Sequence, residues 1–288
     1  MQNWQPPAHL QQITTIDAHT AGEPLRIITS GLPPIPGDTI LEKRAFARQH
    51  HDDLRRALMW EPRGHADMYG AILTEPTTPD GDVGVLFIHN EGFSTMCGHG
   101  IIGMTKVMVD TGEFPVEVGA DSAMIRIDTP AGRVTATAHI VDGICTHVSF
   151  QNVPSFLLER DLTVDVPGYG AVTCDIAYGG AFYAYTDADV LGLTLDDANQ
   201  RACIDAGTAI KQAVIDAYKL QHPDGDDDLN FLYGTILVSR TQGADPAAHS
   251  RNVCIFADGE VDRCPTGTGV SGRIAIHHAR EELEPAAN

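Results

Sequence analysis

Two short segments of this sequence place a polar or reactive side chain directly before a glycine-rich turn. The first reads CGHGIIGMTKVM from Cys97, and the second reads TGTGVSGRIAIH from Thr266. When the two segments are aligned, three glycines coincide: Gly98 with Gly267, Gly100 with Gly269, and Gly103 with Gly272. In both copies an apolar stretch with helical spacing follows. This weak internal repeat predicts two similar halves, each of which offers a helix N-terminus to a shared cleft.

Two helix N-termini that face one another would form an anion-binding site. Each carries unsatisfied backbone N–H groups and a partial positive charge. Glycines after Cys97 and Thr266 allow the backbone to approach a carboxylate closely. The same field lowers a thiol pKa, so we expect Cys97 to have appreciable thiolate character. A thiolate next to a carboxylate-bearing carbon can remove the proton of that carbon. From position and flanking glycines alone, a catalytic Cys97 and a packed cysteine before a helix are equally good interpretations.

The remaining sequence predicts many strands and few helices. Apolar runs such as LRIITSG, YGAILTEP, VGVLFIHNEG, MIRIDTPAG and RVTATAHIVDG are bounded by turn residues, as is typical of strands. Helical spacing without a breaker predicts helices at 39–60, 98–109, 195–220 and 267–283. Together these elements favour an α+β architecture.

Length and composition limit the classes of function. A chain of 288 residues is long enough for two domains. Its net charge of −20 argues against partners such as nucleic acid or an anionic membrane. There is no apolar run of membrane-spanning length and no secretory leader pattern, so a cytoplasmic location is expected. The six cysteines form no C-x-x-C pair and no zinc-binding spacing, which favours free thiols and predicts no metal site.

Four separated segments resemble signature motifs of the proline racemase family. They are DAHTAGEPLRI (17–27), EPRGHADMYGA (61–71), MCGHG (96–100) and DRCPTGTG (262–269), in the family's order and over nearly the whole chain. The resemblance implies an α+β fold of two similar domains of the diaminopimelate-epimerase type, each a curved, mostly antiparallel sheet around a central helix. We expect the domains at 1–125 and 126–288, with the active site in the cleft between them. Family chains usually continue into strands that return to the first domain, and this return is expected to be missing after REELEPAAN.

The resemblance also implies roles for individual residues and a homodimer, and it implies no cofactor. Cys97 matches the family's first catalytic cysteine. The substrate-binding positions are matched by Gly98 and His99 for carboxylate and amine, Asp262 for the ring nitrogen, Gly267 and Thr268 for a second carboxylate-binding turn, and Tyr69 and Phe256 for the aromatic walls. His19 and Glu23 lie in a signature segment and are expected to be structural or to stand just behind the substrate.

The second catalytic position departs from the racemase pattern. Racemases and epimerases of the family read SPCGTG, whereas this chain reads CPTGTG, so Thr266 replaces the second cysteine and Cys264 replaces a serine. A threonine hydroxyl cannot act as a resting base, and this Cys/Thr pairing resembles the dehydratases of the family. Cys264 as a displaced second base is the competing interpretation, but it precedes Pro265 and its side chain is expected to point away.

The resulting prediction is dehydration of trans-3-hydroxy-L-proline to 1-pyrroline-2-carboxylate, with Cys97 as the base at C2. A 4-hydroxyproline epimerase or proline racemase that uses Cys97 and Cys264 is the nearest alternative. A non-catalytic amino-acid-binding protein that kept only the carboxylate site is an alternative of another class.

Overall fold

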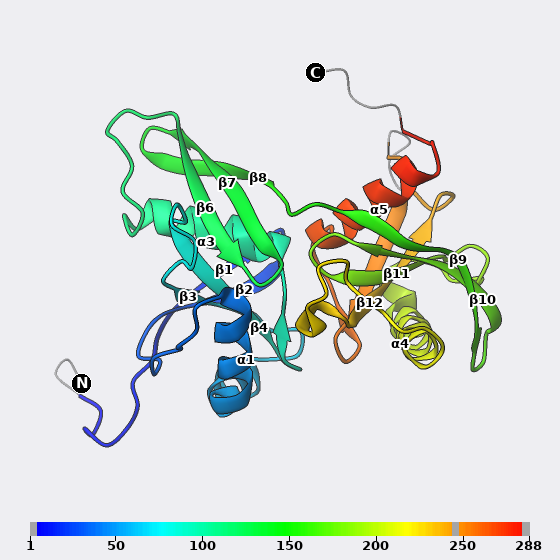
Figure 1. Ribbon diagram of the computed structural model, residues 1–288, viewed down its shortest axis with the longest axis horizontal. Helices are drawn as coiled ribbons and strands as arrows, with labels where there is room; N and C mark the ends of the chain where they lie inside the picture. The colour runs from blue at the N-terminus through cyan, green and yellow to red at the C-terminus, as the bar shows by residue number, and fades with distance from the viewer. Residues whose placement is uncertain (1–4, 244–247, 284–288) are drawn as a thin grey trace.

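A computed structural model describes residues 5–243 and 248–283 and consists of two lobes, each built on one sheet (Figure 1). The first sheet has the strand order β1-β2-β3-β4-β6-β7-β8, with β5 paired to β4. Its elements are β1 (Thr14–Thr20), β2 (Glu23–Ser30), α1 (Ile40–His50), α2 (Asp52–Met59), β3 (Tyr69–Thr74), β4 (Val83–His89), β5 (Phe93–Ser94), α3 (Gly98–Asp110), β6 (Ser122–Thr129), β7 (Gly132–Val141) and β8 (Ile144–Gln151).

The second lobe is built on a six-stranded sheet of order β14-β13-β12-β11-β10-β9. Its elements are β9 (Phe156–Val166), β10 (Gly170–Tyr178), β11 (Phe182–Asp187), η1 (Asp197–Asn199), α4 (Gln200–Ala217), η2 (Asp227–Leu229), β12 (Leu232–Ser239), β13 (Arg251–Phe256), β14 (Glu260–Val261) and α5 (Gly267–Ala279). Most neighbouring strands in both sheets are antiparallel. The expected α+β fold of two mostly antiparallel sheets is therefore confirmed.

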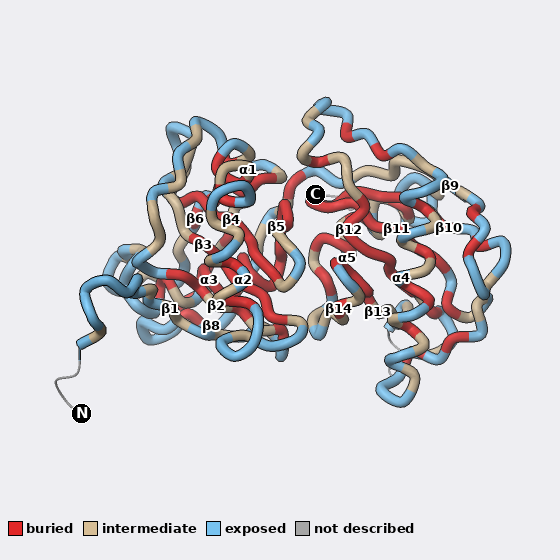
Figure 2. Tube along the Cα trace, turned by 90° about the horizontal axis from the view of Figure 1, so that it is seen from below, coloured by how far each residue is buried: buried red, intermediate tan, exposed pale blue. Residues whose placement is uncertain are grey.

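The first sheet curls around α3. Strands at both ends of the sheet, β1 and β8, contact this helix, as do β2, β3 and β7 between them. The central strand β4 is buried along its whole length, which explains why VGVLFIH is a continuous apolar run rather than an alternating one. In the second lobe α5 packs on β9, β10 and β11, and α4 packs on β9, β11, β12 and β13. The buried segments gather inside the two lobes, and exposed loops surround them (Figure 2).

The change from one sheet to the other falls later in the chain than predicted. The expected boundary at 125/126 lies inside β6, and β6, β7 and β8 all belong to the first sheet. The sheets change between Gln151 and Phe156, where the chain crosses from one lobe to the other (Figure 1). The reason is that the β6–β7–β8 meander pairs with β4 through β6 and closes the sheet around α3.

The predicted helix at 39–60 is also corrected. The structure contains two helices, α1 and α2, separated at His51, whose φ of −128° and ψ of 16° are not helical. The break reorients α2 so that Arg55 can donate to the carbonyl of His89 at 2.8 Å. No helix in the described residues is long and apolar enough to cross a bilayer.

Candidate active site

The two helix N-termini predicted from the repeat face each other across the lobes. Cys97 is the N-cap of α3 and Thr266 is the N-cap of α5. A Cβ atom on Gly98 would lie 3.1 Å from the Cα of Gly267, and a Cβ on Gly267 would lie 3.3 Å from the Cα of Gly98. Both positions therefore need glycine for this close approach. The repeat predicted two helix ends that face one cleft, and the structure confirms this arrangement.

A small buried pocket lies between these helix ends. All nine predicted site residues line it: Tyr69, Cys97, Gly98, His99, Phe256, Asp262, Thr266, Gly267 and Thr268. Four further side chains contribute: Met96, Tyr183, Tyr233 and Cys264. The cavity volume is about 20 Å³, enough for about one water. A proline-sized ligand therefore does not fit in this space as the side chains stand.

Cys97 and His99 form a hydrogen-bonded pair. The Cys97 Sγ lies 3.1 Å from the His99 Nδ1, and the His99 Nε2 lies 3.2 Å from the carbonyl oxygen of Pro24. A carbonyl only accepts, so Nε2 carries the ring proton and Nδ1 is the acceptor. Burial lowers the pKa of His99 to about 4, although Asp262 opposes the shift. His99 is thus a neutral base whose free nitrogen faces the thiol.

The expected thiolate character of Cys97 is not found in this closed structure. Burial raises the pKa of the Cys97 thiol well above its usual 9, and the charges of Cys264, Asp262 and Glu23 add to the rise. The Gly100 N–H donates to Sγ at 3.3 Å and lowers this pKa, but it is outweighed. The helix end contributes as predicted, whereas desolvation and nearby acids, which the sequence alone did not reveal, determine the net direction.

Asp262 organises the turn that precedes α5. Its Oδ1 accepts from the N–H of Cys264 at 2.9 Å, and its Oδ2 accepts from the Thr266 hydroxyl at 2.7 Å. Thr266 has a φ of +62°, which is unusual for a β-branched residue. Such strain is characteristic of functional sites that the surrounding structure holds in place. The Thr266 hydroxyl is therefore used to orient Asp262.

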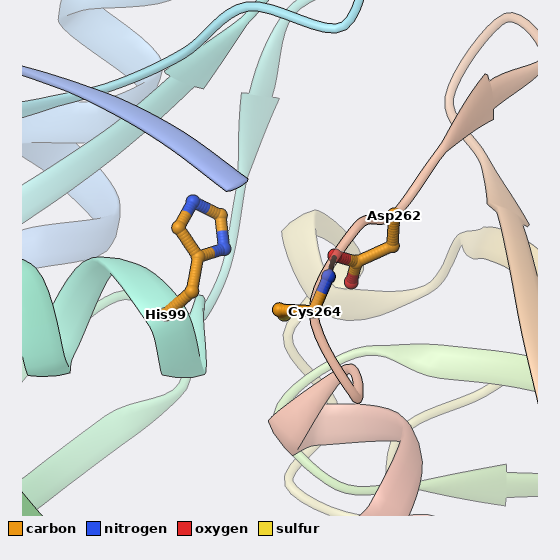
Figure 3. Close-up of side chains that lie close together, drawn as sticks. All are labelled: His99, Asp262 and Cys264. Carbon is orange, nitrogen blue, oxygen red and sulfur yellow. Dashed lines mark hydrogen bonds between the residues drawn. The ribbon is translucent and has the colours of Figure 1, made fainter. Parts of the chain in front are cut away.

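Cys264 lines the pocket, so the expectation that its side chain points away is wrong. A ring nitrogen of His99, a carboxylate oxygen of Asp262 and the Cys264 sulfur lie within 4.8 Å of one another. Figure 3 shows His99 at the start of α3 on one side, and Asp262 and Cys264 on the loop before α5 on the other. Pro265 does not turn the thiol outward, because Cys264 Sγ accepts from the N–H of Thr266 at 3.4 Å. Burial and Asp262 raise the pKa of the Cys264 thiol, which stays protonated.

The same three side chains have the donor types of a transition-metal site. Sequence spacing gave no sign of this cluster, because its members come from the two opposing helix ends. Asp262 is already satisfied by the Thr266 hydroxyl, and His99 by Cys97 and Pro24. Hydrogen bonds within the chain therefore already satisfy Asp262 and His99 without an ion.

Glu23 connects the two lobes behind the pocket. It is fully buried on β2, and its Oε2 accepts from the backbone N–H of Arg263 at 2.8 Å, while Oε1 has no partner. Burial and the charge of Asp262 raise the pKa of Glu23 to about 8. Glu23 thus fixes the loop that carries Asp262. His19, in the same motif, accepts from the N–H of Gly22 at 3.3 Å and shapes a turn.

Glu23→Gln should weaken the pH dependence of stability. Glu23 keeps its proton up to about pH 8 when folded, but titrates near its ordinary pKa of 4.5 when unfolded. Between these values the unfolded chain binds fewer protons, so the free energy of unfolding falls as pH rises from 4.5 to 8. Glutamine stays neutral and can still accept from Arg263. Urea unfolding at pH 5 and pH 8 should show a smaller decline for the variant, and equal declines would contradict the assignment.

Tyr183 and Tyr233 were missed at the sequence level. The Tyr183 hydroxyl lies 2.8 Å from the Thr268 Oγ1, and the Tyr233 hydroxyl lies 3.1 Å from that of Tyr69. All three tyrosines are buried. The available signal was a phenol in an otherwise apolar strand, which needs a buried hydrogen-bond partner. The hydroxyl groups to which Tyr183 and Tyr233 bond lie in the same pocket, and this becomes visible only when the strand pairing of both sheets is known.

Roomier hollows elsewhere lack this convergence. One of about 330 Å³ lies against α5 and is lined by Arg240, Arg273 and Arg280 among others. Arg280 is paired with Asp161 and Asp175 at 2.7 Å. Among the described residues, α5 is the one helix that lines this hollow, so no second helix end faces it and the small interlobe pocket is the better candidate for chemistry.

Comparison with known proteins identifies the family. The family model described as proline racemase matches residues 15–288. A protein of Colwellia psychrerythraea named trans-3-hydroxy-L-proline dehydratase is 51% identical over 285 residues, which cover 98% of this chain and 79% of that protein. A human protein of the same name is 48% identical over 277 residues, covering 94% of this chain and 77% of that protein.

Solved structures agree with this relationship. A hydroxyproline epimerase from Agrobacterium vitis with bound trans-4-hydroxy-L-proline superposes with a TM-score of 0.88 at 29% identity, covering 96% of this chain and 79% of that one. The shared fold, the paired helix ends and the extent of the match lead to one conclusion. The chain belongs to the proline racemase family.

Proposed function

We propose that the chain dehydrates trans-3-hydroxy-L-proline to 1-pyrroline-2-carboxylate. The observation that carries this proposal is the asymmetry of the two helix ends. One presents a thiol next to a neutral imidazole, and the other presents a threonine whose hydroxyl is bound to Asp262. One face of a bound substrate therefore meets a base, while the other face meets a group that cannot ionise. The dehydratase names of the relatives from Colwellia psychrerythraea and Homo sapiens support the same activity.

The substrate carboxylate is proposed to bind between the helix ends. Backbone N–H groups at Gly98, His99, Gly267 and Thr268 would donate to it, and the two helix dipoles would stabilise its charge. The Asp262 carboxylate would bind the ring ammonium. As negative charge develops at C2, the same N–H groups stabilise the carbanion-like transition state. No other ion is required to compensate for either charge of the zwitterion.

Substrate binding removes one obstacle to ionisation of the base. The ammonium offsets the charge of Asp262, which adds to the burial that raises the pKa of the Cys97 thiol. The thiol can then pass its proton to the His99 Nδ1, 3.1 Å away. The resulting thiolate removes the C2 proton. In the trans isomer this proton and the hydroxyl share one ring face, so both lie on the side of Cys97.

The elimination yields an enamine, which tautomerises to the imine product. Thr266 stands at the opposite face and cannot return a proton to C2 efficiently, so the intermediate loses water rather than inverting. These steps use only groups of the chain and of the substrate. Incubation with trans-3-hydroxy-L-proline should give an imine that o-aminobenzaldehyde detects, and absence of turnover with this substrate would refute the proposal.

Epimerisation of a hydroxyproline remains the second candidate, because Cys264 lines the pocket. A protonated thiol on the second face could deliver a proton to C2, which is the step that inversion needs. The hydroxyproline epimerase fold of the Agrobacterium vitis structure is compatible with this chemistry. Against it, Cys264 precedes Thr266 by two residues, and its sulfur already accepts a backbone hydrogen bond.

Thr266→Cys should introduce exchange of the C2 hydrogen from the D-face of proline or 4-hydroxyproline. A thiol at the N-cap of α5 would occupy the second catalytic position, and cysteine, without β-branching, relieves part of the strain at φ +62°. The gain is limited, because an error of about 1 Å in placing a reacting group costs on the order of a hundredfold. Proton NMR in deuterated water with both enantiomers measures the exchange.

Cys264→Ala provides the matched control. Dehydration should be nearly unchanged in this variant, because Cys264 serves neither as base nor as carboxylate ligand in the proposed mechanism. Robust inversion by the wild type that disappeared in Cys264→Ala would instead establish the epimerase. The proposal further includes a homodimer and a cytoplasmic location, and the six free thiols of the described structure support the cytoplasmic location.

A further inference from the structure

The Tyr69 hydroxyl belongs to a buried chain of hydroxyl groups next to Cys97. It lies 2.5 Å from the Ser94 Oγ and 3.1 Å from the Tyr233 hydroxyl. The Tyr69 ring meets the His99 ring edge-on, with centroids 4.8 Å apart. Burial raises the pKa of Tyr69 well above its usual 10, and the neighbouring Cys97 adds to the rise. The phenol, the thiol and the imidazole therefore gather at one wall of the pocket.

This wall is the one that the leaving hydroxyl must face. The dehydration proposed above places the C2 hydrogen and the C3 hydroxyl on the same ring face, toward Cys97. A cysteine that has just taken the C2 proton would otherwise have to reach C3 as well. C2 and C3 are about one bond length apart, so a second proton donor that stands next to C3 would make it unnecessary for Cys97 to reach both atoms. Tyr69 is a pocket-lining hydroxyl that contacts the Cys97 side of the site.

We propose that Tyr69 donates the proton to the hydroxyl that leaves C3, a role that rests on the proposed dehydration. The C2–H bond breaks and its proton goes to the Cys97 thiolate, while its electron pair forms the C2=C3 double bond. The C3–O bond breaks with its pair on oxygen, which takes the Tyr69 proton and leaves as water. The Cys97 proton then passes to the Tyr69 phenolate, and the His99 imidazolium returns its proton to the Cys97 thiolate, so all three groups are back in their resting states.

The buried environment suits this role. A phenol that stays protonated at neutral pH has its proton available for donation when the substrate binds. Because burial raises its pKa, this phenol gives up its proton only to a strong base, and a departing hydroxide is one. Ser94 and Tyr233 can hydrogen-bond the phenolate while it exists. A phenylalanine would fill the same wall but could not donate.

The test compares two leaving groups in Tyr69→Phe. With trans-3-hydroxy-L-proline, kcat should fall about a hundredfold or more, within the usual range for a lost general acid. With trans-3-fluoro-L-proline, fluoride leaves as a weak base that needs little proton donation, so its release should fall less than about tenfold. Fluoride release is followed with an ion-selective electrode, and imine formation with o-aminobenzaldehyde.

Two further variants keep the test decisive. Tyr178→Phe removes another buried phenol, whose hydroxyl has no hydrogen-bond partner in the described part of the chain and does not line the pocket, and it should leave both rates unchanged. Ser94→Ala is small enough to be tolerated if Tyr69→Phe does not fold, and it should also slow loss of water more than loss of fluoride. Binding of pyrrole-2-carboxylate verifies that the pocket is intact in each variant.

The possible failures are distinguishable. If the wild type does not convert trans-3-hydroxy-L-proline, the dehydration itself is refuted, and with it the role of Tyr69. If the wild type is active and Tyr69→Phe retains more than about a tenth of its rate, only the role of Tyr69 is refuted. Equal losses for the hydroxyl and fluoride substrates would also overturn it, because they would indicate a residue that positions Cys97.

Discussion

Cys97→Ser should lower kcat at least about a hundredfold while largely preserving binding of pyrrole-2-carboxylate. Serine keeps the shape of the side chain and can still accept from the Gly100 N–H, which now donates to the sulfur. Its hydroxyl, however, cannot pass a proton to a neutral His99 and so supplies no accessible anion. Removal of a general base typically costs 10²–10⁴-fold in rate, which is the loss expected here.

The comparison of rate and binding makes this prediction specific. Steady-state turnover and calorimetric titration of pyrrole-2-carboxylate are measured on the same preparation. Should Cys97→Ser retain more than about a tenth of the wild-type rate, the thiol would contribute less than roughly 1.4 kcal/mol to transition-state stabilisation, and Cys97 would not be the base. Cys203→Ser is a useful control and should leave the rate unchanged, because Cys203 is a buried cysteine of α4 whose thiol donates to the carbonyl of Thr194 and does not line the pocket.

Asp262→Asn should raise KM strongly and lower kcat as well. The Asp262 carboxylate is expected to pair with the ring ammonium in a partly dry pocket, where breaking such a pair costs about 2–5 kcal/mol. An asparagine also loses one of the two acceptor oxygens that orient the turn, since Oδ1 and Oδ2 now accept from Cys264 and Thr266. Both effects act on substrate placement, so KM and kcat change together.

Pyrrole-2-carboxylate distinguishes charge pairing from mere shape. Its flat ring resembles the deprotonated state and carries no ammonium, so its affinity for Asp262→Asn should fall less than the substrate's. The dissociation constant of this inhibitor is compared with the KM for trans-3-hydroxy-L-proline in both proteins. Equal losses for the two ligands would mean that Asp262 only maintains the turn before α5.

The sequence predicted those parts of the site that depend on local patterns. A glycine after each cap residue, followed by an apolar helix, located α3 and α5, and the repeat related them to each other. The close approach of Gly98 and Gly267 supplies the physical reason for that pattern. The strands that read as clean apolar runs, such as β4, were likewise recognisable because burial on both faces leaves no polar position.

The remaining features depend on long-range contacts that no local pattern encodes. The break at His51 follows from how α2 packs on the first lobe, and the late sheet boundary follows from the pairing of β6 with β4. The acidity of Cys97 was mispredicted because burial outweighs the helix end. Cys264 was misplaced because the turn geometry set by Asp262 was unknown.

The proposed mechanism gives one face of the site a base and the other face none. The most direct test is incubation of the wild-type protein with trans-3-hydroxy-L-proline and, separately, with L-proline in deuterated water, followed by NMR and by o-aminobenzaldehyde. We expect the hydroxylated substrate to give the imine, and L-proline to show no inversion at C2. Inversion of either substrate with deuterium incorporated at C2 and no imine would contradict this mechanism, as would a shift in melting temperature without any turnover.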